Sequence, residues 1–207
     1  EITLVGASKM NDAAACQEAI AAGIDVLGEN RVQQLVEHAE ALEAMGITGA
    51  RFHFIGTLQK NKVKYLADRA VMIHSVDSLS LAEEIERQMA KRGKRMDVLV
   101  EINSGNEASK SGVAMSEAAE LCEEIARLPH LNLRGFMTMA PKCEKNEDYR
   151  KYFRETYKIG LDIWAKKLHN IGRPIFSMGM SASFPIAIEE GADFVRVGRR
   201  LYVPPEE

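Results

Sequence analysis

The stretch Ile-Thr-Leu-Val-Gly-Ala-Ser-Lys at residues 2–9 is apolar on both faces and ends on a single amine, Lys9. These features are typical of a buried strand in a parallel sheet. A lysine at the carboxyl end of such a strand has its stem in the core and its ammonium at the rim. Partial burial favours the neutral amine, the form that condenses with an aldehyde. The alternative is a lysine that only extends from the strand end into solvent.

The pattern of a strand followed by a helix repeats along the whole chain. Predicted strands cover residues 2–9, 24–30, 51–56, 71–76, 97–103, 131–139, 174–178 and 192–197, and helical patterns follow over 13–22, 31–45, 57–69, 78–91, 116–127, 146–170 and a short stretch after 181. Eight βα units in about 200 residues predict an α/β fold with a single (β/α)8 TIM-type barrel. An open doubly wound sheet is the competitor, but it would carry a glycine-rich first turn, and the chain has no G-x-G-x-x-G sequence.

Composition limits the classes of function. With 207 residues and 46% apolar residues, the chain is long enough for one well-cored domain, which we expect to span residues 1–207. The 27 basic and 30 acidic residues are scattered, so we expect neither a nucleic-acid surface nor a membrane surface. Because the chain opens directly on a strand, we expect the natural protein to have a helix before it.

The cysteines and histidines indicate the compartment and the metal content. The three cysteines are odd in number and far apart, which argues against a disulfide framework and for a reducing, cytoplasmic location. The five histidines show no metal-ligand spacing with them, so we expect no metal site.

In a (β/α)8 barrel, chemistry takes place at the carboxyl ends of the strands, and the loops after strands seven and eight often hold phosphate. Here these loops contain Gly179, Ser181, Gly198 and Arg199. Glycine lets backbone N–H groups approach an anion, and a hydroxyl adds another donor. A phosphate site and an amine in one barrel mouth suit a ligand with both a phosphate and an aldehyde. Pyridoxal phosphate (PLP) fits, and a sugar-phosphate carbonyl handled by a Schiff-base aldolase fits nearly as well.

A series of short motifs, in order along nearly the whole chain, resembles the pyridoxal phosphate homeostasis family. The motifs are Ala7-Ser8-Lys9, Gly28-Glu29-Asn30, His53-Phe54-Ile55-Gly56-Thr57-Leu58-Gln59-Lys60-Asn61-Lys62, Ser75-Val76-Asp77-Ser78, Glu101-Ile102-Asn103, Ser109-Lys110-Ser111-Gly112, Arg134-Gly135-Phe136-Met137, Met139, Ser177-Met178-Gly179-Met180-Ser181 and Val195-Arg196-Val197-Gly198. The resemblance implies a barrel similar to the N-terminal domain of alanine racemase. It also implies a PLP carrier or regulator of vitamin B6 balance, without efficient catalysis.

The same resemblance implies a set of cofactor-binding residues: Lys9, Asn30, Met139, Ser177, Gly179, Ser181, Arg196, Gly198 and Arg199. Lys9 would hold PLP as an internal aldimine, and Arg196 would face the pyridine nitrogen. Without the resemblance, the residues alone leave a second interpretation of Arg196 open, a buried ion pair with Glu29 or Glu101. We expect PLP-accepting apoenzymes as partners and a monomer or weak dimer as the assembly.

The chain departs from the family pattern at several positions. Met10 follows the lysine where a proline usually stands nearby, and Ser183 replaces an aspartate at the start of a helix. Arg199 replaces a small residue, and Val203 replaces a glycine. We therefore expect the loop after the eighth strand to be the least secure part of the site, and the loss of the negative charge at residue 183 to loosen the phosphate loop.

The alternative function is a PLP-dependent amino-acid racemase or lyase. Racemisation needs a base on each face of the substrate's Cα carbon. The resemblance extends to the alanine racemases, in which a tyrosine from an additional β domain of the partner subunit is the second base. This chain ends soon after its eighth strand and has its five tyrosines on predicted helices or in the tail. We therefore expect no second base.

Overall fold

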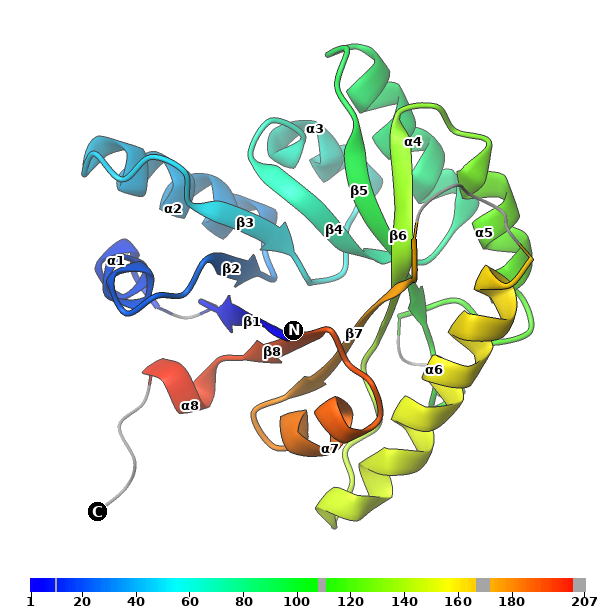
Figure 1. Ribbon diagram of the computed structural model, residues 1–207. Helices are drawn as coiled ribbons and strands as arrows, with labels where there is room; N and C mark the ends of the chain where they lie inside the picture. Colours follow the sequence, from blue (N-terminus) through cyan, green and yellow to red (C-terminus); the bar gives the residue numbers. More distant parts are fainter. Residues whose placement is uncertain (10, 108–110, 167–171, 203–207) are drawn as a thin grey trace.

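The computed structural model describes residues 1–9, 11–107, 111–166 and 172–202. Eight parallel strands close into a barrel in chain order, and β1 pairs with both β2 and β8 (Figure 1). The strands are β1 (Thr3–Ala7), β2 (Val26–Glu29), β3 (Arg51–Phe54), β4 (Ala70–Val76), β5 (Met96–Ile102), β6 (Leu131–Thr138), β7 (Ile175–Met180) and β8 (Phe194–Val197). The predicted barrel is confirmed, and the competing open sheet is wrong.

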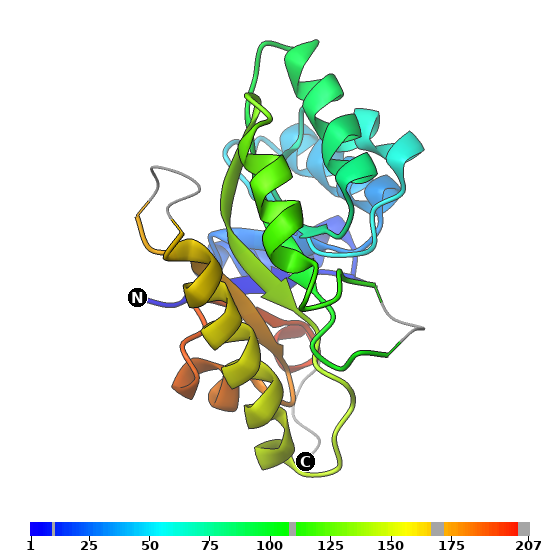
Figure 2. The same ribbon diagram turned by 90° about the vertical axis from the view of Figure 1, so that its right-hand side faces the viewer.

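Helices connect successive strands and cover the outside of the barrel (Figure 1). They are α1 (Ala13–Ala21), α2 (Val32–Ala44), η1 (Lys60–Lys62) with α3 (Val63–Leu66), α4 (Leu79–Ala90), α5 (Ala118–Ala126), η2 (Asn146–Asp148) with α6 (Tyr149–Trp164), α7 (Phe184–Glu189) and α8 (Arg199–Tyr202). Figure 2 shows α5 and α6 side by side on one flank of the barrel, where both contact β6. No helix in the described ranges is long and apolar enough to cross a membrane.

The buried apolar residues form two separate clusters. The large one lies mainly between the sheet and the helices and includes Phe54, Phe136, Phe153 and Phe176. The small one contains Met72, Leu99 and Met137, with Met139, Ile175 and Phe194 packed against it. This separation follows from the strand period of two, because alternate side chains point toward the helices and into the barrel.

Local sequence explains where several elements begin and bend. The Asp12 side chain accepts a hydrogen bond from the Ala15 N–H at 2.9 Å and caps α1. Gly135 of β6 pairs with Ile175 of the neighbouring parallel strand β7. A Cβ atom there would lie 2.0 Å from the Ile175 carbonyl oxygen, so only glycine fits.

Some predicted boundaries are wrong. The first strand ends at Ala7, and Lys9 lies in the following turn with its side chain exposed, not partly buried at a strand end. The long sixth helix begins only at Tyr149 after a 3-10 turn, and part of its predicted end falls in 167–171, outside the described residues. The short helix α8 was not predicted. Val203, which replaces a glycine of the family pattern, lies outside the described residues.

Candidate functional site

The carboxyl ends of β1 and β8 adjoin each other. A Cβ atom on Gly198, directly after β8, would lie 3.0 Å from the Ala7 carbonyl oxygen at the end of β1. The Ser8 N–H donates to the Gly28 carbonyl of β2 at 3.1 Å, and Lys9 follows directly. Lys9 therefore stands at the end of the barrel where β1, β2 and β8 finish, and its exposed side chain is accessible to a ligand.

The loops after β7 and β8 are joined by a hydrogen bond. The Gly198 N–H donates to the Ser181 hydroxyl oxygen at 3.3 Å. Gly179 has a φ of +88°, and a Cβ there would lie 2.6 Å from the Ala187 Cβ, so this close packing requires glycine. The hydrogen bond between Ser181 and Gly198 therefore joins the two predicted phosphate-binding segments.

Ser183 changes this surface in a specific way. Its hydroxyl accepts a hydrogen bond from the Met180 N–H at 3.2 Å and does not cap α7. One backbone donor of the loop is therefore already satisfied within the protein. Arg199, another departure from the family pattern, is exposed at the start of α8.

Arg196 extends from β8 into the barrel and is only 4% exposed. Its guanidinium donates to the Ser177 carbonyl at 2.7 Å, the Ser177 hydroxyl at 2.6 Å and the Thr138 carbonyl at 2.9 Å. Burial lowers the Arg196 pKa to about 10, so the group remains a cation at neutral pH. Met139, Gly179 and Ser183 lie with Arg196 around a gap that is too small to hold a water molecule.

Neither ion-pair partner proposed for Arg196 pairs with it among the described residues. Glu29 instead contacts His38 and Ser8. Glu101 accepts from the Ser111 hydroxyl at 2.7 Å. Burial raises the pKa of Glu101, while the Ser111 bond and the more distant charge of Arg196 lower it.

A chain of buried polar side chains extends from Arg196 across the barrel. His74 Nδ1 lies 2.9 Å from the Ser177 hydroxyl oxygen, and His74 Nε2 lies 2.9 Å from His53 Nδ1. Since the Ser177 oxygen accepts from Arg196, its hydroxyl proton is directed to His74, which in turn donates to His53. Burial, followed by neighbouring positive charge, lowers the pKa of His53 to about 3 and that of His74 well below its ordinary value. Both histidines are therefore neutral.

These histidines should make stability fall at acid pH. In the unfolded chain a histidine has a pKa of about 6.5. Below that pH the unfolded state therefore binds protons that His53 and His74 do not bind in the folded state. For each pH unit below that value, each of the two histidines should lower the free energy of unfolding by up to about 1.4 kcal/mol. In urea titrations between pH 7 and pH 5, His53→Gln should show a shallower loss than the unmodified protein. Equal slopes would contradict the neutral assignment.

Behind Lys9, a second cluster joins β1, α1, β2 and α2. The Ser8 hydroxyl donates to Glu29 Oε1, and His38 Nδ1 lies 2.7 Å from the same oxygen. Cys16 Sγ lies 3.6 Å from His38 Nδ1. Contact with Cys16 and Glu29 raises the pKa of His38 to about 10.

The structure thus brings most predicted site residues to one end of the barrel and adds others. Arg196 is hydrogen-bonded to Ser177 and Gly198 to Ser181, and Met139 and Gly179 lie near Arg196 around the same small gap. Asn30 follows β2 with its Oδ1 buried and unpartnered among the described residues. Sequence reasoning missed His53, His74 and Thr138. Strand parity is the signal that could have found the two histidines, because they take inward-facing positions on adjacent strands.

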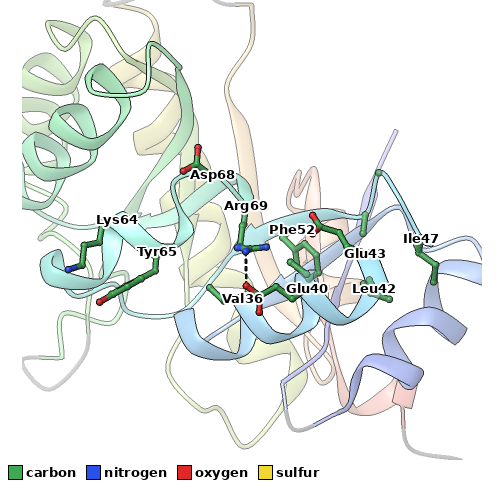
Figure 3. A pocket seen from close by; sticks show the side chains of 13 residues that line it. Val36, Glu40, Leu42, Glu43, Ile47, Phe52, Lys64, Tyr65, Asp68 and Arg69 are labelled. Carbon is green, nitrogen blue, oxygen red and sulfur yellow. Dashed lines mark hydrogen bonds and ion pairs between the residues drawn. The ribbon is translucent and has the colours of Figure 1, made fainter. Parts of the chain in front are cut away.

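Another pocket lies away from this end of the barrel. Figure 3 shows this pocket of about 700 Å³ between α2 and α3, beside the Arg69–Glu40 ion pair. It includes Gly49 and Ala50, which precede β3, and Asp68, which precedes β4. It therefore lies toward the amino ends of the strands, and none of the predicted cofactor residues line it.

Comparison with known proteins agrees with the barrel. The family model described as "Alanine racemase, N-terminal domain" matches residues 6–205. The structure of an alanine racemase from Clostridium difficile 630 superposes with a TM-score of 0.78 at 20% identity, covering 100% of this chain and 53% of that one. Fold and site together define a barrel protein of the alanine racemase N-terminal-domain class.

Two nearer relatives narrow this class. A pyridoxal phosphate homeostasis protein of Aquifex aeolicus (strain VF5) is 42% identical over 199 residues, covering 96% of this chain and 85% of that protein. The structure of PipY from Synechococcus elongatus PCC7942, with PLP bound, has a TM-score of 0.88 at 28% identity and covers 97% of this chain and 92% of that one. The chain belongs to the pyridoxal phosphate homeostasis protein family.

Proposed function

We propose that this protein binds PLP at the carboxyl end of its single barrel domain and acts in the intracellular homeostasis of that cofactor. The observation that carries the proposal is the convergence of Lys9, the Ser181–Gly198 loop pair and buried Arg196 where β1, β7 and β8 end. An amine, an anion-binding loop surface and a fixed cation match the aldehyde, phosphate and pyridine nitrogen of one ligand.

Each group of PLP has a candidate partner in the chain. The exposed amine of Lys9 would form the Schiff base. The Ser181 hydroxyl and backbone N–H groups of Gly179–Ser181 and Gly198–Arg199 would hold the phosphate, for which the Met180 and Gly198 N–H groups would exchange their present partners, Ser183 and Ser181. Asn30 offers an unpartnered buried oxygen beside the end of β1, which favours a polar ligand there. Met139 would pack against the ring, and Ser177 would hold Arg196 toward it.

The proposal includes no efficient turnover of amino acids. Bound PLP supplies an electron sink whose strength depends on a protonated ring nitrogen. A guanidinium cation only donates hydrogen bonds and cannot accept one, so Arg196 opposite the ring nitrogen would favour the unprotonated form of that nitrogen. Racemisation also needs a second base. Tyr65, Tyr149, Tyr152 and Tyr157 lie on outer helices, and the Tyr202 hydroxyl is buried beside Gly6.

The proposal also includes PLP-accepting apoenzymes as partners, a monomer or weak dimer as the assembly, and the cytoplasm as the compartment. Among the described residues, eight large apolar side chains are exposed, including Met45, Tyr65 and Leu161, and each comes from a different element or end of the chain. This distribution favours a monomer or weak dimer. An accessible Lys9 suits transfer of PLP to apoenzymes. Three cysteines without disulfides favour the cytoplasm.

The function is tested by spectroscopy and by an amino-acid assay on the same preparation. We expect a Schiff-base absorption band when PLP is added, and its loss after borohydride reduction. With saturating L-alanine or L-serine, we expect no D-isomer, keto acid or ammonia at enzymatic rates. Turnover of about 1–10³ per second would instead support the racemase or lyase alternative.

A further inference from the structure

Three side chains with metal-binding atoms meet behind the turn that carries Lys9. Cys16 comes from α1, Glu29 from the end of β2 and His38 from α2, and their ligand atoms all lie within 4.8 Å of one another. Cys16 and Glu29 are 0% exposed and His38 is 6% exposed. Within the ranges that the structure describes, this is the one group of three such residues.

The spacing of two of these atoms is that of zinc ligands. For a tetrahedral site with Zn–S of about 2.3 Å and Zn–N of about 2.05 Å, sulfur and nitrogen are separated by about 3.6 Å. Cys16 Sγ and His38 Nδ1 lie 3.6 Å apart. His38 Nδ1 and Glu29 Oε1 are closer, at 2.7 Å, because they share a hydrogen bond. A metal would therefore have to use the other carboxylate oxygen or replace this proton.

The other carboxylate oxygen is available. Glu29 Oε2 is buried and has no hydrogen-bond partner among the described residues, whereas Oε1 contacts both Ser8 and His38. Burying a carboxylate oxygen without a hydrogen-bond partner costs free energy of folding, and a cation beside the oxygen would offset that cost. The Ser8 hydroxyl would hold Oε1 from outside the metal site, as outer hydrogen bonds commonly fix metal ligands.

We propose that Cys16, Glu29 and His38 bind one zinc ion, with solvent in the fourth position. Sulfur, imidazole nitrogen and carboxylate are together a zinc donor set, whereas Mg²⁺ and Ca²⁺ require mainly oxygen ligands. On binding, the protons of the Cys16 thiol and His38 Nδ1 leave to solvent.

The site would brace the segment that carries Lys9. Ser8, which bonds Glu29, directly precedes Lys9, and the cluster ties α1 and α2 to the same strand ends. The proposal does not depend on PLP binding.

The test is titration of the purified, chelator-dialysed protein with Co²⁺ and then Zn²⁺. We expect one equivalent of Co²⁺ to produce the visible bands of a tetrahedral ion and a thiolate charge-transfer band, both abolished by an equivalent of Zn²⁺. Zn²⁺ should also raise the thermal midpoint. Cys16→Ala should remove the charge-transfer band and weaken Zn²⁺ binding at least about tenfold.

Cys122→Ala is the matched control, because Cys122 is also a fully buried free cysteine but lies on α5. This variant should bind Co²⁺ and Zn²⁺ like the unmodified protein. His38→Gln, checked for its fold by circular dichroism, should lose tight binding as Cys16→Ala does. Absence of saturable binding, or binding unchanged by Cys16→Ala, would show that the cluster is only a proton-sharing Glu29–His38 pair with a neighbouring thiol.

Discussion

Lys9→Ala is expected to abolish covalent attachment of PLP to this protein. Lys9 is the amine at the junction of β1, β2 and β8, and its side chain is exposed. Without it, the phosphate loops and Arg196 still offer non-covalent contacts, so weak binding should persist. Mixing PLP with the variant should produce no Schiff-base absorption band. Borohydride treatment followed by peptide mapping should find no pyridoxyl group on the chain, whereas the unmodified protein should carry it on the peptide containing Lys9.

Lys62→Ala provides the control for this experiment. Lys62 is also exposed and lies in η1, which follows the carboxyl end of β3. Its removal should leave both the band and the labelled Lys9 peptide unchanged. A label that persists in Lys9→Ala and maps to Lys62, or to Lys110 outside the described residues, would overturn the site assignment. Since Lys9 is a surface residue, its loss should change unfolding free energy by no more than about 0.5 kcal/mol.

The barrel was predictable because its strands are short apolar runs separated by helical periodicity. Val98, Val100 and Ile102 mark β5 clearly, and all are buried as expected. The end of β1 was not predictable. Apolar character continues through Ala7, and only the turn geometry after it determines that Lys9 lies beyond the strand and in solvent.

Candidate site residues were predictable where they lie in loops after strands, and less so inside the barrel. Ser181 and Gly198 follow β7 and β8, so topology alone brings them together. Contacts across the barrel depend on register. His74 and Ser177 are separated by 103 positions in the chain, and no sequence spacing relates them. The same holds for Cys16 and His38, which helices α1 and α2 bring into contact although their spacing resembles no metal motif.

Arg196→Met is expected to destabilise the fold strongly as well as weaken PLP binding. The substitution keeps an unbranched side chain but removes the donors for the Ser177 carbonyl, the Ser177 hydroxyl and the Thr138 carbonyl. Buried acceptors that lose their donors cost about 1–3 kcal/mol each, and relief of the buried guanidinium charge offsets part of this. We expect a net loss of about 3–5 kcal/mol in unfolding free energy, measured by urea denaturation without PLP.

Arg154→Met is the comparison that separates this effect from loss of any arginine. Arg154 lies on α6 and pairs with Glu190 at 2.8 Å, but it is exposed, so its loss should shift the urea midpoint only slightly. Arg196→Lys should fall between the two, because an ammonium keeps the charge but cannot reproduce the planar arrangement of donors toward Ser177 and Thr138. If Arg196→Met were as stable as Arg154→Met, the bonds to Ser177 and Thr138 would not hold the barrel together. Arg196 would then matter only for the ligand, and PLP should stabilise Arg196→Met less than it stabilises the unmodified protein.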